Sequence, residues 1–129
     1  MIRLDAVSKS WDEGRTFSAR EVSFHVDAGE FLVLLGPSGG GKTTTLKMIN
    51  RLVEPSSGRV LIDGVDAASL PPNALRRRIG YAFQAVGLFP HMSVAENVGV
   101  TPRLLGWAGP RIRERVDALL RRVELAPQE

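Results

Sequence analysis

The chain of 129 residues contains no cysteine, few aromatic residues and no apolar run long enough to cross a bilayer. Without cysteine, neither a disulfide framework nor a cysteine metal site can form, and a reducing compartment is compatible with the composition. The first residues, MIRLDAVSKSW, carry charge where a signal peptide has its apolar stretch. We therefore expect a cytoplasmic protein that reaches a membrane only through a partner.

Strong charge bias is also missing. At 43% hydrophobic and 24% charged, the composition is that of a soluble globular protein, and the formal net charge is only +3. Arginines gather in residues 76–78 and 111–122, with no aromatic residues interleaved. We favour solvated helix faces over a nucleic-acid footprint for these clusters, and we expect no nucleic-acid partner. His25 and His91 lie too far apart in sequence to suggest a metal pair.

The most informative segment is a glycine-rich loop. Residues 36–43 read GPSGGGKT, a complete G-x-x-x-x-G-K-[ST] phosphate-binding motif. Residues 31–35 before it are a short unbroken apolar run, typical of a strand buried on both faces of a parallel sheet. Residues 42–52 after it place apolar side chains at helical spacing. A strand, a glycine loop and a helix in this order are the context that the motif requires.

Each type of residue in the loop has a chemical role. Glycines lack Cβ, so the backbone can turn several N–H groups toward one anion, and the following helix adds the positive end of its dipole. Lys42 can reach the β- and γ-phosphates, and the Thr43 hydroxyl can ligate Mg²⁺. A glycine turn that merely precedes a lysine would leave both flanks unexplained. The predicted phosphate contacts are Gly39, Gly40, Gly41, Lys42, Thr43 and Thr44.

Further elements follow from alternation and turn signals. Residues 2–7 and 21–27 alternate well enough to predict strands, which places a β layer before the loop. Residues 59–62 predict another strand, residues 74–78 a short basic helix, and residues 79–83 a further strand.

The last third of the chain predicts helices. Residues 93–96 read SVAE, a capping box that opens a short helix through Val98. Gly109 and Pro110 precede an amphipathic helix to which we assign packing and no chemistry. The apolar face of this helix consists of Ile112, Val116, Leu119, Leu120 and Val123.

Gln84 is a second candidate for the site. It directly follows the predicted strand over 79–83, and α/β proteins place ligand-contacting side chains at the carboxyl ends of strands. Taken alone, however, Gln84 is better interpreted as an ordinary loop glutamine.

These motifs together resemble a known family. Trp11, then GPSGGGKTTTLKMINRLVEPSSGRVLIDG, then LRRRIGYAFQAVGLFPHMSVAENV are similar, in this order, to the ATP-binding subunit of an ABC transporter. The segments TLKMINRLVEP, IGYAFQAVGLFPHMSV and LLGW resemble the importers of osmoprotectants such as glycine betaine, carnitine, choline or proline. The resemblance runs over essentially the whole chain. It implies an α/β fold with a P-loop NTPase core of parallel sheet and flanking helices, an N-terminal antiparallel β layer and the start of a helical subdomain.

The resemblance implies roles for single residues. Trp11 matches the aromatic residue that stacks on adenine, although by itself it suggests only a partly exposed turn aromatic. Ser38 joins the loop residues that contact phosphate and Mg²⁺. Gln84 matches the glutamine that touches Mg²⁺ and the attacking water, which reverses the interpretation from the residue alone. The implied catalytic residues are therefore Lys42 and Gln84, with Thr43 and Gln84 at the metal.

The resemblance also implies a division of the chain. Residues 1–84 match the β layer and the P-loop core, and residues 85–129 match the start of the helical subdomain. Within the second part, the LFPH sequence at residues 88–91 lies in the stretch that meets the permease. His91 does not match the catalytic histidine of the family.

Three parts of the family pattern do not occur within these residues: the LSGGQ signature, an apolar strand ending in Asp-Glu, and the switch histidine. They supply the trans contact to the γ-phosphate, the support of Mg²⁺ and the general base. We therefore expect the N-terminal half of a nucleotide-binding domain. Because the Asp-Glu strand lies beside the P-loop strand in such folds, we expect the isolated chain to be poorly stable or self-associating.

Three functions remain open from the sequence. The first is an ABC importer subunit at the inner face of the cell membrane, which binds ATP and Mg²⁺, pairs with a second ATPase subunit and couples hydrolysis through permease subunits to osmoprotectant uptake. The second is a nucleotide-binding module without turnover. The third is an unrelated P-loop kinase or GTPase, which is disfavoured because Trp11, Gln84 and the GLFPHMSV stretch would then be coincidences.

Overall fold

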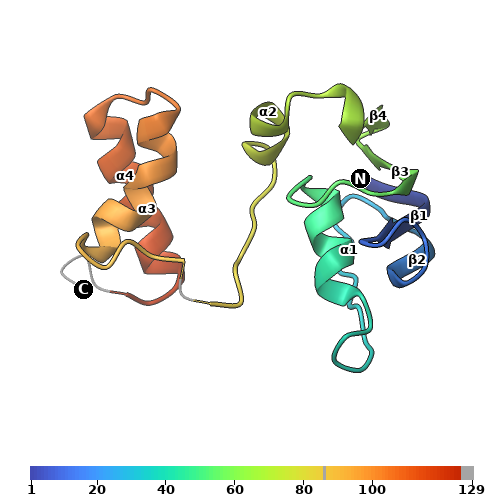
Figure 1. Cartoon of the computed structure of the whole chain (residues 1–129). Helices are drawn as coiled ribbons and strands as arrows, with labels where there is room; N and C mark the ends of the chain where they lie inside the picture. Colours follow the sequence, from blue (N-terminus) through green and yellow to red (C-terminus); the bar gives the residue numbers. More distant parts are fainter. Residues whose placement is uncertain (86, 126–129) are drawn as a thin grey trace. The chain divides into compact units, whose positions relative to one another are not determined.

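The chain folds into two compact units. The computed structural model describes residues 1–85 and 87–125, and it divides into Met1–Tyr81 and Ala82–Glu129 (Figure 1). The predicted second part over 85–129 includes positions 86 and 126–129, which lie outside the described residues.

A four-stranded antiparallel sheet forms the first unit. Its strands are β1 (Ile2–Ser10), β2 (Phe17–Val26), β3 (Ser57–Ile62) and β4 (Val65–Asp66), in the order β2-β1-β3-β4. The strands predicted over 2–7, 21–27 and 59–62 are confirmed. Strand β1 ends later than predicted, and strands β2 and β3 begin earlier than predicted.

An irregularity in β1 changes which side chains face the core. Ala6 has a φ of 47°, and the pairing with β2 and β3 shifts register around it. Leu4 and Val7 are therefore both buried, although an uninterrupted strand would place them on opposite faces. The Ala6 N–H donates to Ser23 Oγ at 2.8 Å, so a side chain satisfies a backbone donor at the bulge.

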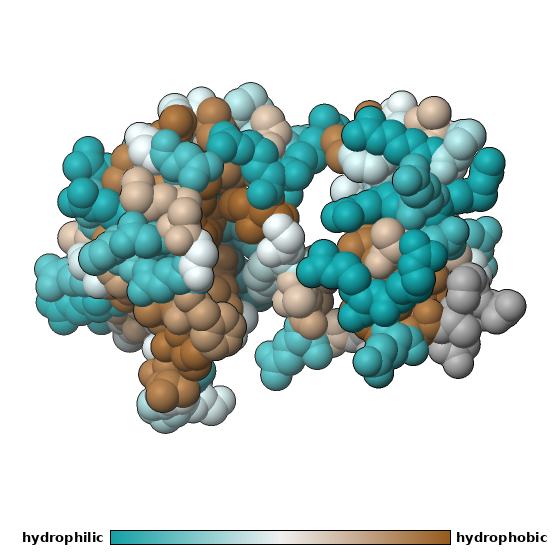
Figure 2. All heavy atoms as spheres, turned by 180° about the vertical axis from the view of Figure 1, so that it is seen from behind, coloured by the Kyte–Doolittle hydropathy of each residue, from teal (hydrophilic) through white to brown (hydrophobic). Residues whose placement is uncertain are grey.

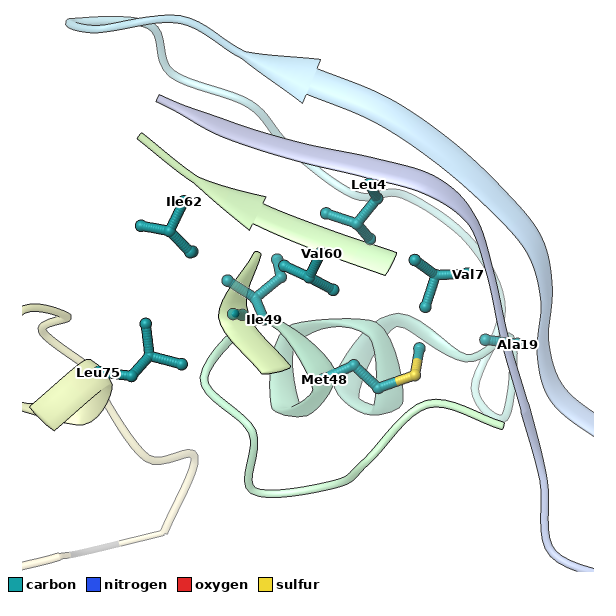
Figure 3. Close-up of a cluster of buried hydrophobic side chains, with 9 residues drawn as sticks. Leu4, Val7, Ala19, Met48, Ile49, Val60, Ile62 and Leu75 are labelled. Atoms are coloured by element: carbon teal, nitrogen blue, oxygen red, sulfur yellow. The ribbon is translucent and has the colours of Figure 1, made fainter. Parts of the chain in front are cut away.

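One helix covers the inner face of this sheet. Helix α1 (Lys42–Ile49) buries Met48 completely and Ile49 almost completely, while Leu46 remains about half exposed. The prediction of a helix directly after the loop is confirmed, but the helix ends at Ile49 and not at residue 52. Figure 3 shows how this helix, the sheet and α2 meet. The core consists of Leu4, Val7, Ala19, Met48, Ile49, Val60, Ile62, Ala67 and Leu75.

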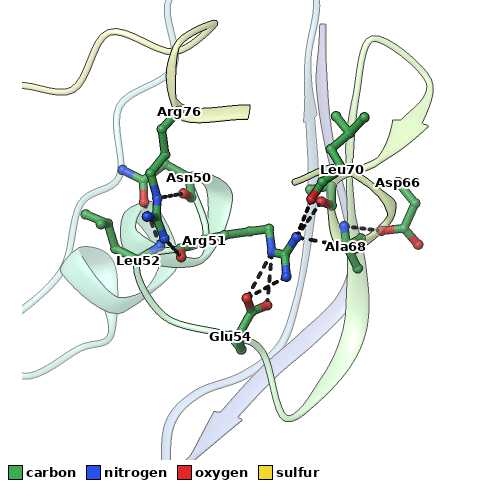
Figure 4. A network of polar contacts seen from close by, with 9 residues as sticks. Asn50, Arg51, Leu52, Glu54, Asp66, Ala68, Leu70 and Arg76 are labelled. Atoms are coloured by element: carbon green, nitrogen blue, oxygen red, sulfur yellow. Dashed lines mark hydrogen bonds and ion pairs between the residues drawn. The ribbon is translucent and has the colours of Figure 1, made fainter. Parts of the chain in front are cut away.

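A single arginine ties the end of α1 to the next connection. Arg51 has a φ of 54°, so the backbone leaves the helix there. Its guanidinium donates to the carbonyl of Ala67 (3.2 Å), the first residue of the 3₁₀ helix η1 (Ala67–Ser69), and to the carbonyl of Leu70 (2.7 Å), which follows that helix. It also forms an ion pair with Glu54 at 2.7 Å (Figure 4). The planar fork of arginine suits this multiple donation to fixed acceptors.

The basic cluster at residues 76–78 also serves the fold. Helix α2 (Pro72–Arg76) buries Leu75 in the core and has proline at its first position, so the short helix predicted over 74–78 forms but begins and ends earlier. Arg76 donates to a backbone carbonyl at the end of α1 (3.2 Å), and Arg78 donates to the Asp63 carboxylate (2.9 Å). Two of the three arginines therefore bond to groups of the first unit.

Two predicted strands are wrong. Neither residues 31–35 nor residues 79–83 form a strand, and the sheet of the described residues is entirely antiparallel. A strand requires a hydrogen-bonded neighbour, and none of the four strands pairs with either segment. Phe31 is 89% exposed and Leu35 is 88% exposed. Apolar side chains consequently reach the surface of the first unit (Figure 2).

The described residues of the second unit form two helices. Helix α3 (Val94–Leu104) starts with the predicted capping box, in which Ser93 Oγ accepts from the Glu96 N–H and the Glu96 carboxylate accepts from the Ser93 N–H. The helix is longer than predicted because it continues through Pro102 to Leu104.

Helix α4 (Gly109–Arg122) confirms the predicted amphipathic helix. Its Val116 and Leu120 are buried, and Gly99 of α3 lies close to Ile112. Val123, which the sequence assigned to the same apolar face, is 63% exposed because it follows the last helical residue. Among the described residues, no helix combines the length and apolar character needed to span a membrane.

The turn between β1 and β2 is organised by one carboxylate. The Asp12 side chain accepts hydrogen bonds from the Thr16 hydroxyl (2.7 Å), the Thr16 N–H (2.7 Å) and the Ser10 hydroxyl (2.8 Å). These bonds favour the ionised form and lower the pKa of Asp12 to about 2. The same turn carries Trp11, so its geometry bears on the candidate site.

We predict that loss of the Arg51 guanidinium destabilises the first unit. Replacing Arg51 by Met leaves the Leu70 carbonyl without its donor and removes one of the two donors to the Ala67 carbonyl, which also accepts from the Leu70 N–H; the loss is expected to cost about 1–3 kcal/mol. Urea denaturation measures the change in the free energy of unfolding. Arg59→Met is the control, since Arg59 is 63% exposed and makes one surface ion pair with Asp5. An equal effect of the two substitutions would contradict the prediction.

We also predict an acid-sensitive contribution from the Asp12 turn. Because the pKa of Asp12 is depressed in the folded chain, its contribution to stability is present above the unfolded pKa of about 4 and is lost as the pH falls toward 2. Asp12→Asn should remove this part of the pH dependence, which is measured as the difference between the two proteins' unfolding curves from pH 5 to pH 2. An NMR titration midpoint of Asp12 at its ordinary value would refute the assignment.

Candidate functional site

The glycine loop lies directly before α1 and contains backbone conformations that other residues rarely adopt. Gly39 and Gly41 have φ values of 81° and 82°, both in the left-handed region. At Gly41 the surroundings are equally restrictive, because an added Cβ would lie 2.2 Å from the Ser18 carbonyl oxygen. The loop therefore requires glycine at this position for both its conformation and its contact with β2.

The N-terminus of α1 is open to an anion. Gly41 is the residue before the helix, no side chain caps the first turn, and the first turn contains no acidic residue. The first N–H groups of a helix have no partners inside it, and the helix dipole places partial positive charge there. Within the described structure, nothing in the chain competes with a bound phosphate for these donors.

Lys42 places its charge beside the loop. Its Nζ donates to the carbonyls of Gly36 (2.7 Å) and Pro37 (2.6 Å), both in the loop itself. An ammonium group has three donors, so one remains for a ligand in this arrangement. The lysine thus supplies a positive point charge where the helix also directs its N–H groups.

The hydroxyl groups of the motif are accessible. Ser38 and Thr43 are exposed and Thr44 is partly exposed. In the part of the chain that the structure describes, none of these three hydroxyls bonds to another protein group. Thr45 is different, since it is buried and its Oγ1 donates to the Gly41 carbonyl at 2.9 Å. The three hydroxyls predicted to contact phosphate or Mg²⁺ are therefore accessible to a ligand. The Thr45 hydroxyl instead stabilises the first turn of α1.

Trp11 lies in the turn that follows β1 and is 66% exposed. Its Nε1 donates to Ser18 Oγ at 2.7 Å, and Lys9 Nζ lies 4.4 Å from the centre of the indole ring. One ring face is thus covered by a cation, and the ring plane is held by a hydrogen bond. Because Ser18 also touches Gly41, the structure brings Trp11 and the glycine loop into one neighbourhood.

Gln84 belongs to the second unit. It is exposed and lies in a bend outside every helix and strand. The strand over 79–83, whose carboxyl end was expected to present Gln84, does not form. Its proposed role at the metal therefore rests on the family resemblance alone.

The residues present fit a magnesium nucleotide better than a resident metal. Among the described residues, no group of three histidine, cysteine, aspartate or glutamate side chains converges on one point. Mg²⁺ is commonly held by one or two protein oxygens together with substrate phosphates, and the Thr43 hydroxyl is such an oxygen. The left-handed loop, the uncapped helix and Lys42 supply the donors for the phosphates.

Two contributors to the site escaped the sequence analysis. Ser18 meets Trp11 only through the pairing of β1 with β2, and nothing in its local sequence marks it. Lys9 and Trp11 are two residues apart, a spacing that could have suggested a shared side of an extended segment.

The comparisons with known proteins point to one family. The ABC transporter family matches residues 19–129. The glycine betaine/carnitine/choline transport ATP-binding protein OpuCA of Bacillus subtilis is 45% identical over 128 residues, covering 99% of this chain and 33% of that protein. The osmoprotectant import ATP-binding protein OsmV of Salmonella typhimurium is 48% identical over 128 residues, covering 97% of this chain and 34% of that protein. The chain thus spans about a third of the length of these relatives.

The similar solved structures are also ATP-binding cassettes, which agrees with the family match. The ATP-binding cassette MJ0796, solved as a dimer bound to ADP and Pi, matches with a TM-score of 0.85 and 32% identity, over 98% of this chain and 59% of the cassette. The α/β cassette fold is thereby confirmed, although the two segments predicted as parallel strands do not form strands here. On the match to residues 19–129 and on these relatives, the chain belongs to the ABC transporter family.

Proposed function

We propose that this chain forms the ATP-binding part of an ABC importer ATPase that couples ATP hydrolysis to uptake of an osmoprotectant-type solute. The observation that carries the proposal is the phosphate site itself: a left-handed glycine loop, an uncapped helix N-terminus and Lys42 at its edge. The names of the two relatives support the solute class, since one transports glycine betaine, carnitine and choline and the other imports osmoprotectants.

In this proposal the first unit binds the nucleotide. The loop N–H groups and Lys42 hold the phosphates, the hydroxyls of Ser38 and Thr44 add contacts, and Thr43 contributes an oxygen to Mg²⁺. Trp11 offers its open face to adenine, since an indole ring stacks well on a base. Bound Mg²⁺ neutralises charge that develops on the phosphates during transfer.

The second unit is proposed to contribute a residue that responds to the bound nucleotide. Gln84 would orient the attacking water and contact Mg²⁺, so Lys42 and Gln84 are the proposed catalytic residues. The unit corresponds in this view to the start of the helical subdomain, and its exposed Leu88 and Phe89 belong to the segment that meets a permease. The Phe89 backbone is fixed by Asn97, whose Oδ1 accepts from the Phe89 N–H at 2.7 Å.

The proposed assembly contains a second ATPase subunit and permease subunits. A dimeric cassette among the similar structures supports the pairing, and the relatives are named as transport ATP-binding proteins. We place the complex at the cytoplasmic face of the membrane, with the permease as the only membrane contact.

A module that binds ATP without turnover is the second candidate. The phosphate site described above would support it, because the glycine loop, the N-terminus of α1 and Lys42 are groups that bind phosphate and include no general base. These groups by themselves are expected to bind ATP, whereas hydrolysis also needs a general base and a further contact to the γ-phosphate.

We predict that Lys42→Ala weakens binding of Mg²⁺–ATP by about tenfold to a hundredfold, because charge-assisted hydrogen bonds to the phosphates are lost. Calorimetric titration measures the affinity. Lys47→Ala is the matched control: Lys47 lies on the same helix, is exposed, and is not part of the loop. Equal affinities for wild type and Lys42→Ala would contradict the proposed site.

Release of inorganic phosphate separates the two candidate functions. Binding without release by the wild-type chain supports the module without turnover. Mg²⁺-dependent release that Lys42→Ala abolishes would instead show that these residues suffice for hydrolysis, and it would overturn the expectation of an incomplete site.

A further inference from the structure

Ser18 makes two different contacts at the candidate site. Its hydroxyl oxygen accepts a hydrogen bond from Trp11 Nε1 at 2.7 Å. Its backbone carbonyl packs against Gly41, so closely that an ideal Cβ on that glycine would lie 2.2 Å from the oxygen and 3.3 Å from the carbonyl carbon. One residue of β2 therefore touches both the aromatic side chain and the last glycine of the phosphate loop.

Both ends of this link are held in place. Ala19, the next residue of β2, is 7% exposed and belongs to the core, so the backbone at Ser18 is anchored. Gly41 is anchored by α1, because its carbonyl accepts from the Thr45 N–H at 2.8 Å and from Thr45 Oγ1 at 2.9 Å. Movement of Ser18 is consequently limited on the side of the sheet and on the side of the loop.

The aromatic side chain lacks such an anchor of its own. Trp11 is 66% exposed and stands in a turn, where a free indole would sample several rotamers. Two contacts restrict it: the bond to Ser18, and Lys9 Nζ over one face at 4.4 Å. Because the cation covers one face, a planar ligand can stack only on the other face.

We propose that Ser18 is a positioning residue that fixes the orientation of the Trp11 platform relative to the phosphate loop, so that a nucleotide's base and phosphates engage together. The proposal rests on the proposed function, in which the loop binds the phosphates of ATP and Trp11 stacks on its base. When the platform is fixed beforehand, binding of the base costs less conformational entropy. Ser18 thus contributes to affinity only for ligands that carry a base.

Two ligands test this distinction. Mg²⁺–ATP carries both base and phosphates, whereas Mg²⁺–tripolyphosphate carries only the phosphate chain. We expect Ser18→Ala to weaken ATP binding by roughly threefold to tenfold, the range of one hydrogen bond, and to leave tripolyphosphate binding unchanged. Ser18→Thr keeps the hydroxyl and should restore ATP affinity. Ser57→Ala is the matched control, since Ser57 is exposed at the start of β3 and its side chain makes no hydrogen bond among the described residues.

The fluorescence of Trp11 gives a second measurement, which would not change if Ser18 only stabilised the fold. The chain has two tryptophans, so Trp107→Phe leaves Trp11 as the single indole emitter. In that background Ser18→Ala should shift the Trp11 emission and reduce the change that ATP produces, while tripolyphosphate produces no change in either protein.

The outcomes are distinct. Equal weakening of ATP and tripolyphosphate by Ser18→Ala, or no weakening of either, would overturn the role of Ser18 while leaving the phosphate site intact. The same holds if wild type binds both ligands equally, because Trp11 then adds nothing. Failure of wild type to bind either ligand would instead contradict the proposed function.

Discussion

The contact between α1 and the antiparallel sheet is the constraint on which the candidate site depends. Met48 and Ile49 pack against Leu4, Val7 and Val60, and this burial fixes where the helix lies and where it begins. The helix contains only eight residues, too short to be stable by itself in water, so tertiary packing must hold it. Because the phosphate donors are the first N–H groups of α1, the chemistry of the loop depends on an apolar contact at the other end of the helix.

Polar groups then define the ends of this arrangement. Arg51, just after α1, donates to the carbonyls of Ala67 and Leu70 and so holds the η1 connection. Asp12 accepts hydrogen bonds within the β1–β2 turn, and these bonds favour its ionised carboxylate. Around the ligand position, by contrast, the chain leaves donors unused: α1 has no side-chain cap, and the exposed hydroxyls of Ser38 and Thr43 have no protein partner among the described residues. Polar groups that are hydrogen-bonded within the chain stabilise the fold, and donors without a protein partner remain to bind the phosphates.

The apolar segment at residues 31–35 shows the limit of predicting strands from hydrophobicity. Residues 31–35 have the composition of a buried parallel strand, yet Phe31 and Leu35 are almost fully exposed. A strand is a property of two hydrogen-bonded segments, and the four strands of the described sheet pair only with one another. The structural match to the similar cassette covers 98% of this chain but only 59% of the cassette. Much of that cassette therefore has no counterpart in these residues.

The local elements and the identity of the phosphate loop follow from residue patterns alone. The motif, the capping box at Ser93 and the alternation in residues 2–7 are short-range patterns, because the interactions behind them lie within a few residues. Three further features emerge only from the folded chain: residues 31–35 stay outside the sheet, a bulge at Ala6 turns Val7 inward, and Ser18 joins Trp11 to Gly41. These features depend on strand pairing and register between segments distant in sequence, for which no local residue pattern carries the information.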